Sequence, residues 1–243
     1  TYGFYKSQVA LFGLEATRIP LREDFTLNVD DYMDFPGTIV IANPNAPTGI
    51  AVPRTDIQRL LEADPDRVVI VDEAYVDFGA ESCVPMIFRY DNLLVVQTMS
   101  KSHSLAGLRI GAALANENLI AALNCVKNSF NSSTLNRIAL AGAEGAVRDQ
   151  DYFRATTTKI IHTRDRVAVE LKLLGFEVCD SSANFLFVRH PQADAKALLD
   201  GVRDRGVLVR WWDKPRIRDY LRISIGTDEE MDTLCQILKG RLA

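Results

Sequence analysis

The sequence predicts an α/β protein in which a mostly parallel sheet is flanked by helices and followed by a smaller C-terminal α+β domain. In the first half of the chain, short apolar runs that fit buried strands alternate with segments of helical periodicity. From about residue 116 the pattern becomes helical, and short strands and helices then mix up to the C-terminus. We therefore expect two domains, over residues 1–150 and 151–243, with the boundary in or before a helix.

In the first domain, four apolar runs are expected to form strands, at 37–44, 67–75, 92–100 and 108–115. Between the first two runs, Ile57, Leu60 and Leu61 fall on one face of a predicted helix that a proline closes. This strand–helix–strand order at short spacing is typical of a doubly wound sheet. The connection before the fourth strand is too short for a helical crossover, so this strand is expected to run antiparallel.

The second half begins with three predicted helices, and the last of them is long enough to bridge two domains. These helices cover 117–130, 133–150 and 151–175. The elements expected after them are strands at 176–181, 184–190, 207–212 and 220–226 and helices at 194–206 and 228–242. This mixture predicts a small α+β domain.

The composition favours a globular protein that binds a small molecule. Of the 243 residues, 47% are hydrophobic and 25% are charged, which is ordinary for a folded domain with a real core. The net charge is −4 and the basic residues are scattered, so the electrostatic footprint of a nucleic-acid-binding protein is missing. No apolar run approaches the roughly 18 residues of a membrane-spanning helix, and no signal peptide is recognisable. Four widely spaced cysteines indicate reduced thiols in a cytoplasmic protein.

Polar residues follow three of the predicted strands at the carboxyl ends, where ligands bind in an open α/β sheet. The three stretches are 43–49, 72–75 and 100–102. Taken separately, they fit a turn, a helix cap and a surface lysine. Taken together, they fit a site in which a desolvated Lys101 is a nucleophilic amine and Asp72 keeps a pyridine nitrogen protonated.

A phosphate group would complete this site. The hydroxyl groups of Ser100 and Ser102 and the guanidinium of Arg109 can hold a phosphate through charge-assisted hydrogen bonds. An amine suited to Schiff-base formation, a carboxylate and a phosphate cradle together predict pyridoxal 5′-phosphate as the cofactor. The nearby His103 invites a role as a base, but the lysine already fills it. No metal-ligand spacing is present, so no metal is expected.

The motifs NPNAPTG (43–49), VDEAY (71–75) and SKSHSLAGLRIG (100–111) resemble those of fold-type I pyridoxal-phosphate-dependent aminotransferases. Within this group they are most similar to the histidinol-phosphate aminotransferase family. The resemblance runs from TYGFY at the N-terminus to the final helix, and the lysine and DEAY motifs together are highly specific. It implies the fold-type I architecture and a site that is completed across a homodimer.

The resemblance assigns catalytic roles to Lys101, Asp72 and Tyr75. Lys101 would hold the cofactor covalently and later move a proton between the substrate and the cofactor. Asp72 would pair with the pyridine nitrogen, and Tyr75 would hydrogen-bond the phenolic oxygen. Ser100 and Arg109 match residues that bind the cofactor phosphate, whereas Ser102 is a weaker match.

Two further cofactor contacts are implied nearer the N-terminus. Tyr2 matches the aromatic residue that stacks on the pyridine ring. Where the family usually has Asn-Asn-Pro-Thr-Gly, this chain has NAPTG at 45–49, and the asparagine before the proline usually binds the phenolic oxygen. Ala46 cannot make this bond, so we expect Tyr75 alone, Asn45 or a water molecule to replace it.

For the substrate, the resemblance implies a pair of arginines. Arg210 and Arg222 match the two residues that grip the substrate phosphate in histidinol-phosphate enzymes, and a dianion suits two guanidinium groups better than one. Asn184 matches a position on the substrate side of the cofactor. Trp211 and Trp212 either cover apolar surface or wall the pocket.

The implied function is amino-group transfer between L-histidinol phosphate and 2-oxoglutarate, which yields imidazole acetol phosphate and glutamate in histidine biosynthesis. Alternatives of the same fold are an aromatic-amino-acid aminotransferase and a threonine-phosphate decarboxylase. An alternative of another class is a non-catalytic regulatory module that binds the cofactor. Family members carry an upstream segment that supplies early strands and part of the phosphate cradle. This chain begins after it, at Thr1, so we expect a fragment or processed chain, and impaired cofactor retention if the protein itself lacks that segment.

Overall fold

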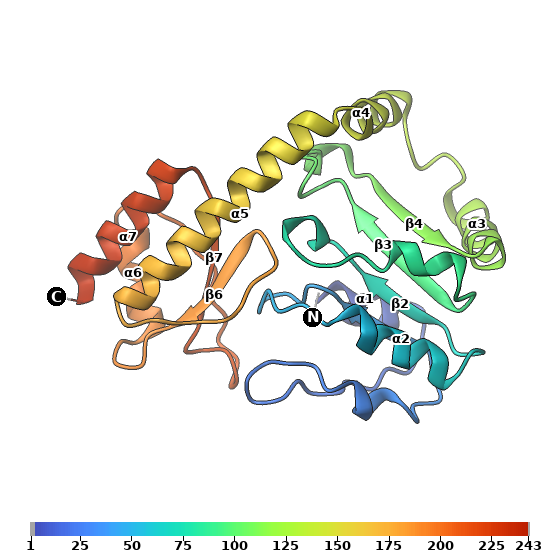
Figure 1. Cartoon of the computed structure of the whole chain (residues 1–243), viewed down its shortest axis with the longest axis horizontal. Helices are drawn as coiled ribbons and strands as arrows, with labels where there is room; N and C mark the ends of the chain where they lie inside the picture. The colour runs from blue at the N-terminus through green and yellow to red at the C-terminus, as the bar shows by residue number, and fades with distance from the viewer. Residues whose placement is uncertain (1–2, 243) are drawn as a thin grey trace.

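A computed structural model describes residues 3–242, and in it the chain forms two sheets that each carry their own helices. The long helix α5 (Gln150–Leu173) runs from the first sheet to the second, as Figure 1 shows. This is the bridging helix that the sequence predicts. The division into domains at residue 150 stays a prediction, and the start of α5 is the place in the structure to which it corresponds.

The first sheet has four strands in the order β1-β2-β3-β4. They are β1 (Ile39–Ala42), β2 (Val69–Asp72), β3 (Leu93–Thr98) and β4 (Gly111–Ala115). The first three are parallel and β4 is antiparallel to β3, as its short connection predicts. The predicted α/β class with a mostly parallel sheet is confirmed, and the parallel strands all end at one edge of the sheet.

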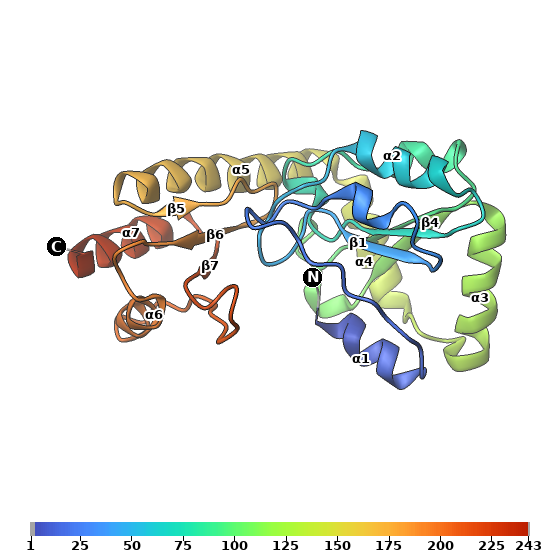
Figure 2. The same cartoon turned by 90° about the horizontal axis from the view of Figure 1, so that it is seen from below.

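One face of this sheet packs against helix α2 (Arg54–Ala63). The helix buries Ile57, Leu60 and Leu61, the three residues whose spacing predicts its inner face. In Figure 2, α1 (Phe4–Leu11) lies on the other side of the sheet from α2. The sequence does not predict α1, because none of its residues is buried and no apolar stripe marks it.

The helices that follow the first sheet begin at residues whose side chains accept a hydrogen bond from the first turn. These caps are Asn116, Asn136 and Asp149. They open α3 (Glu117–Asn131), α4 (Arg137–Arg148) and α5 respectively. Short 3₁₀ turns complete this part of the fold, at Val29–Tyr32, Val76–Phe78, Val84–Phe88 and Ala106–Leu108.

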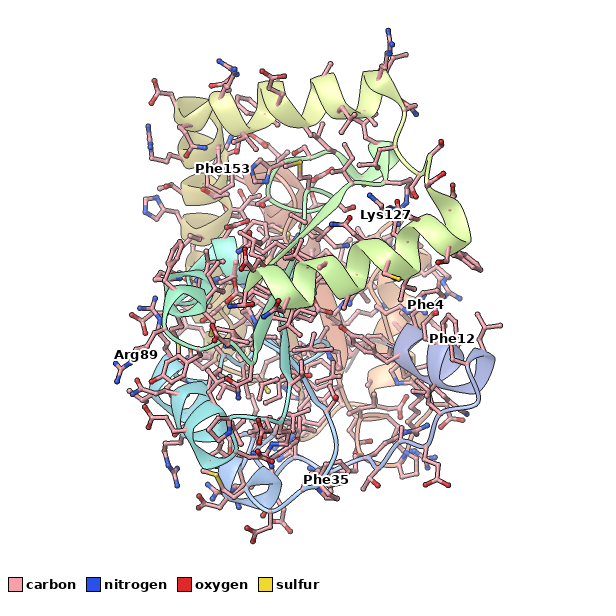
Figure 3. The ribbon with its side chains drawn as sticks, turned by 90° about the vertical axis from the view of Figure 1, so that its right-hand side faces the viewer. Phe4, Phe12, Phe35, Arg89, Lys127 and Phe153 are labelled. Carbon is pink, nitrogen blue, oxygen red and sulfur yellow. The ribbon has the colours of Figure 1, made fainter. Side chains whose placement is uncertain are left out.

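Large apolar side chains are exposed on the first sheet, away from α2, and on the helices that follow β4. Val40 on β1 is 41% exposed, and Phe130 and Ile138 on the helices beyond β4 are 84% and 78% exposed. Phe4 and Phe12 add to this set, and Figure 3 shows both at the edge of the molecule. Apolar patches of this kind mark surfaces that pack against other protein.

The second sheet is antiparallel, in the order β5-β6-β7. Its strands are β5 (Glu177–Val178), β6 (Phe185–Arg189) and β7 (Leu221–Ser224). One face packs on α5, α6 (Ala195–Arg203) and α7 (Asp228–Leu242), with Leu186, Val188, Leu221 and Ile223 in a shared core. Because side chains alternate along a strand, Phe185, Phe187 and Arg222 point to the opposite face.

The prediction of a strand at 207–212 is wrong, because this segment does not pair with a neighbouring strand along its length. Only Arg210 forms a bridge, with Arg222 of β7. Val207, Val209 and Trp211 still contact the core of the second sheet, so the alternating pattern that suggests a strand is real. The segment then enters the turns of residues 215–219, where Pro215 has no amide hydrogen to donate to a ladder.

Several contacts join the two sheets, and two of them involve buried side chains. Arg164 of α5 is 7% exposed, and its Nη1 donates to the carbonyl oxygens of Phe78 at 2.6 Å and Ala183 at 3.1 Å. The ring of Phe25 meets those of Phe187 and Tyr220 edge-on, at 5.7 and 5.2 Å between centroids. The two cores are therefore held against each other by buried groups. Within residues 3–242, no helix combines the length and apolar character needed to cross a membrane.

Candidate active site

The carboxyl ends of β1, β2 and β3 lie side by side and bring the predicted motifs to one edge. The register pairs Ala42 with Asp72 and Asp72 with Val96, and the ladder continues when the amide of Glu73 donates to the carbonyl of Val96 at 2.8 Å. Lys101 follows five residues after Val96. Parallel pairing thus places the DEAY motif and the lysine motif next to each other.

Asp72 is half-buried at the end of β2, and both of its carboxylate oxygens accept hydrogen bonds. Oδ1 accepts from the amide of Ala74 at 3.1 Å, and Oδ2 accepts from the hydroxyl of Tyr5 at 2.6 Å. The next residue, Glu73, is fully buried and accepts from Ser82, Cys83 and Gln97. Asp72 is therefore the carboxylate of the DEAY motif that faces the site, whereas Glu73 holds the surrounding loops in place.

Lys101 occupies a tight turn after β3. The amide of Leu105 donates back to the carbonyl of Met99 at 2.9 Å, and Ser104 has a positive φ of 57°. Lys101 is an exposed residue as a whole. Its amine is nevertheless partly buried, and this burial lowers the pKa of the amine. The positive charges of Arg222 and Arg109 lower this pKa further. A lysine with a lowered pKa is a better nucleophile at neutral pH.

Aromatic rings link the lysine to the second sheet. Nζ of Lys101 lies 5.6 Å from the ring centre of Tyr75, and that ring meets Phe185 of β6 edge-on at 5.1 Å. The guanidinium carbon of Arg222 lies 5.0 Å from the ring centre of Phe185. Residues that sequence reasoning placed in two domains therefore form one continuous site.

The predicted arginine pair lies on the side of the site that the second sheet forms. Arg210 and Arg222 exchange two backbone hydrogen bonds, of 2.9 and 2.8 Å, and each guanidinium carbon lies 5.5 Å from the ring centre of Trp212. Burial lowers the pKa of Arg222, and the charge of Arg210 acts in the same direction, against that of Tyr75. The buried Nε of Arg222 has no hydrogen-bond partner among the described residues. An anion would satisfy both the charge and this donor.

The three residues considered for the cofactor phosphate differ in burial and in hydrogen bonding. Arg109 has a left-handed backbone with φ of 56°, and its Nη1 donates to the carbonyl of Ala106 at 2.9 Å. Ser100 is half-buried directly beside Lys101. Ser102 is buried instead, and its hydroxyl donates to Asp77, so the weaker match is engaged elsewhere.

The NPNAPTG turn is held by its own side chains. Asn43 donates to the carbonyl of Val52 at 3.0 Å and accepts from its amide at 2.8 Å. Asn45 lies at the end of β1, but its Nδ2 donates to Thr48 at 2.8 Å, so its amide group is bonded within the turn. The structure brings Asn45 to the expected edge of the sheet, but its side-chain donor is engaged within the turn.

Three remaining assignments have different outcomes. Asn184 directly precedes β6, and its carbonyl accepts from the amide of Ile225 at 3.0 Å, which places it beside Phe185 at the seam between the sheets. His103 stacks on Phe153 at 4.6 Å between centroids. Tyr2 lies outside the described residues, so its predicted stacking role stays a prediction.

Sequence reasoning missed Tyr5 and left two interpretations open for Trp212, and the structure places both residues at the site. Tyr5 reaches Asp72 from α1, and no local pattern signals a contact between residues 67 positions apart. Trp212 contacts both arginines of the pair. Its position two residues after Arg210 is a usable signal, because alternate residues of an extended segment share a face.

The donor set fits a cofactor with an aldehyde, a pyridine ring and a phosphate. Lys101 supplies an amine of lowered pKa, Asp72 a carboxylate at the neighbouring strand end, and Arg109 a cation close enough to influence that amine. Among the described residues, no group of three or more potential metal ligands is present. The site can therefore hold an organic cofactor through charge and covalent attachment.

Comparisons with known proteins agree with this chemistry. Residues 1–238 match the family described as Aminotransferase class I and II. A histidinol-phosphate aminotransferase from Acinetobacter baumannii is 51% identical over 239 residues, which cover 98% of this chain and 66% of that protein. Another from Clostridium acetobutylicum is 49% identical over 243 residues, which cover 100% of this chain and 69% of that protein.

A solved structure extends the comparison to the fold. The histidinol-phosphate aminotransferase from Sinorhizobium meliloti, in complex with pyridoxal-5′-phosphate, has a TM-score of 0.88 at 26% identity and covers 99% of this chain and 68% of its own. The chain spans about two thirds of the length of the curated relatives it matches. From the motifs, the fold and the match over residues 1–238, the chain belongs to the class I and II aminotransferase family.

Proposed function

We propose that this chain carries the reaction centre of a pyridoxal-phosphate-dependent transaminase that transfers an amino group between L-histidinol phosphate and 2-oxoglutarate. The observation that carries the proposal is the joint presence of Lys101, whose amine has a lowered pKa, and the arginine pair Arg210 and Arg222 in one site. Relatives with about half of their residues identical bear the name of this activity.

Pyridoxal phosphate, when bound, supplies an aldehyde that condenses with amines and a ring that withdraws electron density from the substrate α-carbon. Lys101 would be its covalent anchor, and its amine would then move the proton at that carbon. Asp72 would hold the proton on the ring nitrogen, and Tyr75 would donate to the phenolic oxygen. Ser100 and Arg109 would bind the phosphate.

The substrate assignment rests on charge. A phosphomonoester carries close to two negative charges near neutral pH, and two guanidinium groups on one face can bind it with forked hydrogen bonds. Arg222 also has a buried donor that needs an acceptor. Asn184 would line the substrate side of the cofactor, next to β6. An amino acid without a phosphate would leave part of this charge unpaired.

We infer a homodimer in the cytoplasm as the working form. The exposed apolar side chains on α3 and α4 support an interface there. All four cysteines are free thiols, which supports a reducing compartment. Sedimentation of the purified protein would test the dimer, and a monomer at micromolar concentration would contradict it.

The absorption spectrum of the chain with added pyridoxal phosphate tests the cofactor assignment. We expect a visible band, and borohydride reduction followed by peptide mapping should find the pyridoxyl group on Lys101. Lys101→Arg should abolish both signals, whereas Lys127→Arg, at an exposed position of α3, should leave them unchanged. A label at another lysine, or equal behaviour of the two variants, would show that Lys101 is not the anchor.

The same spectrum tests the substrate. Histidinol phosphate should remove the visible band, and 2-oxoglutarate should restore it. Phenylalanine at the same concentration should have little effect, because it brings no phosphate to Arg210 and Arg222. A band that responds only to phenylalanine would move the function to aromatic transamination.

A further inference from the structure

Trp212 contacts both of the arginines that we assign to the substrate. The guanidinium carbons of Arg210 and Arg222 are each 5.5 Å from the centre of its ring, within the range of cation–π contacts. Arg222 also lies 5.0 Å from the ring centre of Phe185. One indole thus contacts both charges of the pair, and one of these charges has a second aromatic neighbour.

The backbone explains why these side chains meet. Arg210 and Arg222 are a hydrogen-bonded antiparallel pair, and side chains that are directly opposite in such a pair project from the same face. Trp212 follows Arg210 by two residues and therefore shares its face. Trp211 projects to the other face, where it packs against the core of the second sheet and its Nε1 donates to the carbonyl of Arg218 at 2.6 Å.

The pair needs such a neighbour before an anion arrives. Two like charges that branch from paired residues repel each other, and the partial burial of Arg222 removes some of the water that would screen this repulsion. No carboxylate within salt-bridge distance of either guanidinium is found among the described residues. The electron-rich face of the indole is the group in contact with both of them, and its rigid ring restricts where each guanidinium can point.

We propose that Trp212 is a positioning residue that holds Arg210 and Arg222 at a fixed spacing, so that the pair is preorganised for the phosphate dianion of the substrate. This proposal rests on the proposed function, since it assumes that the pair binds substrate. It assigns different tasks to the adjacent tryptophans: Trp211 stabilises the second domain, and Trp212 sets the affinity for the anion. A tryptophan that merely covers apolar surface would not change anion binding when replaced by another apolar residue.

Phosphate affinity of Trp212 variants is the test. Inorganic phosphate is titrated by calorimetry into the holoprotein, and KM and kcat are measured with histidinol phosphate. We expect Trp212→Leu to weaken phosphate binding and raise KM by about tenfold, with kcat changed less than twofold. Trp212→Phe keeps an aromatic face and should restore most of the affinity. Leu208→Ala, on the same segment at an 80% exposed position, is the matched control and should change neither quantity.

The outcomes separate this proposal from the function on which it rests. If Trp212→Leu binds phosphate as the unchanged chain does while Arg222→Gln loses binding, the positioning role is wrong and the substrate assignment stands. If Arg210→Gln and Arg222→Gln also bind phosphate normally, the substrate assignment itself is wrong.

Fluorescence gives a second readout that does not depend on the stability of the leucine variant. The chain has two tryptophans, so Trp211→Phe leaves Trp212 as the only indole. Phosphate that binds the pair brings negative charge next to guanidinium groups that contact the indole, so the emission of Trp212 should change with the midpoint found by calorimetry. An emission spectrum that stays constant at saturating phosphate would contradict the proposal.

Discussion

Lys101, at the centre of the site, is exposed to solvent and yet has an amine of lowered pKa. Its side chain is reachable from solvent, while burial and the charges of Arg222 and Arg109 lower the pKa of its amine below the ordinary value of 10.5. Each positive charge disfavours the protonated form. Removal of either arginine should therefore raise this pKa, so that a higher pH is needed to obtain the neutral amine.

Competitive amine labelling across a pH series checks this effect in the cofactor-free chain. In the unchanged chain, Lys101 should react at a lower pH than an ordinary lysine. Arg222→Gln should move the midpoint for Lys101 to higher pH, and Arg109→Gln should do so to a smaller extent. Arg154→Gln, which removes an exposed arginine of α5, should leave the midpoint in place. Equal midpoints in all three variants would contradict the electrostatic account.

Tyr5 offers a second test at this scale. Tyr5→Phe removes the hydroxyl that donates to Oδ2 of Asp72, so the carboxylate loses one of the two bonds that orient it. A hydrogen bond to a charged group contributes about 1.5–3 kcal/mol, and we expect roughly tenfold weaker binding of pyridoxal phosphate. The dissociation constant is measured by the change in absorbance.

The matched control for Tyr5 is Tyr90→Phe. The hydroxyl of Tyr90 also donates to a carboxylate at 2.6 Å, that of Glu62, but this pair is exposed and belongs to no part of the site. It should leave cofactor affinity within twofold. If both phenylalanine variants bind the cofactor equally well, the contact seen at Asp72 has no part in holding it.

Much of the candidate site could be predicted at the residue scale, for a physical reason. The carboxyl ends of parallel strands share an edge, so motifs that follow such strands meet wherever the strands pair. This rule brings Asp72 and Lys101 together without further information. The contacts of Tyr5 and Trp212 depend on how α1 and the second sheet pack, and local patterns do not encode that packing. The catalytic and binding roles stay predictions until the variants are measured.

Among the elements, the turn after β1 depends most strongly on one residue. Gly49 has φ of +79°, and a Cβ there would lie 2.8 Å from Cβ and 3.2 Å from Cα of Ser181. Its carbonyl also accepts from the amide of Ser182 at 2.9 Å, so the turn touches the chain just before β6. This glycine is required both for its backbone conformation and for the close approach of the two sheets.

Gly49→Ala should therefore destabilise the protein by about 3 kcal/mol, because backbone strain and a steric clash add. Gly206→Ala isolates the first contribution. Gly206 has φ of +81° with nothing within 4 Å of an added Cβ, and its replacement should cost about 1 kcal/mol. Urea denaturation gives both values, and equal losses would show that the contact with Ser181 carries no energy.

The elements themselves were predicted where periodicity is strong. Buried parallel strands appear as apolar runs, and α2 appears as an apolar face, because burial selects for both patterns. Helix α1 was not predicted, because none of its residues is buried and burial is what produces an apolar face. The segment 207–212 shows the converse: its alternation reflects burial of one side, and burial alone does not make a paired strand.

At the scale of the whole molecule, Arg164 connects the two sheets through carbonyl groups. Its Nη1 is shared between Phe78 and Ala183, and its Nη2 lies 2.9 Å from Asp165. Arg164→Gln should leave two buried carbonyl groups without their donor and reduce the free energy of unfolding by about 3 kcal/mol. Thermal or urea unfolding measures the loss.

The control for Arg164 is Arg154→Gln on the same helix. Arg154 pairs with Asp151 at 2.7 Å, and both side chains are exposed. Surface pairs of this kind contribute little, so the loss should stay below about 0.5 kcal/mol. A similar loss in both variants would mean that the bonds of Arg164 across the seam do not stabilise the fold.

The position of Arg222 has an evolutionary consequence. The same guanidinium that would select a phosphorylated substrate also lowers the pKa of the lysine that would perform the chemistry. Substrate choice and amine basicity are therefore one trait under selection, because a mutation at Arg222 changes both. A descendant that adopts an uncharged substrate by losing this arginine inherits a more basic lysine, whose pKa is then lowered only by burial and by the charge of Arg109.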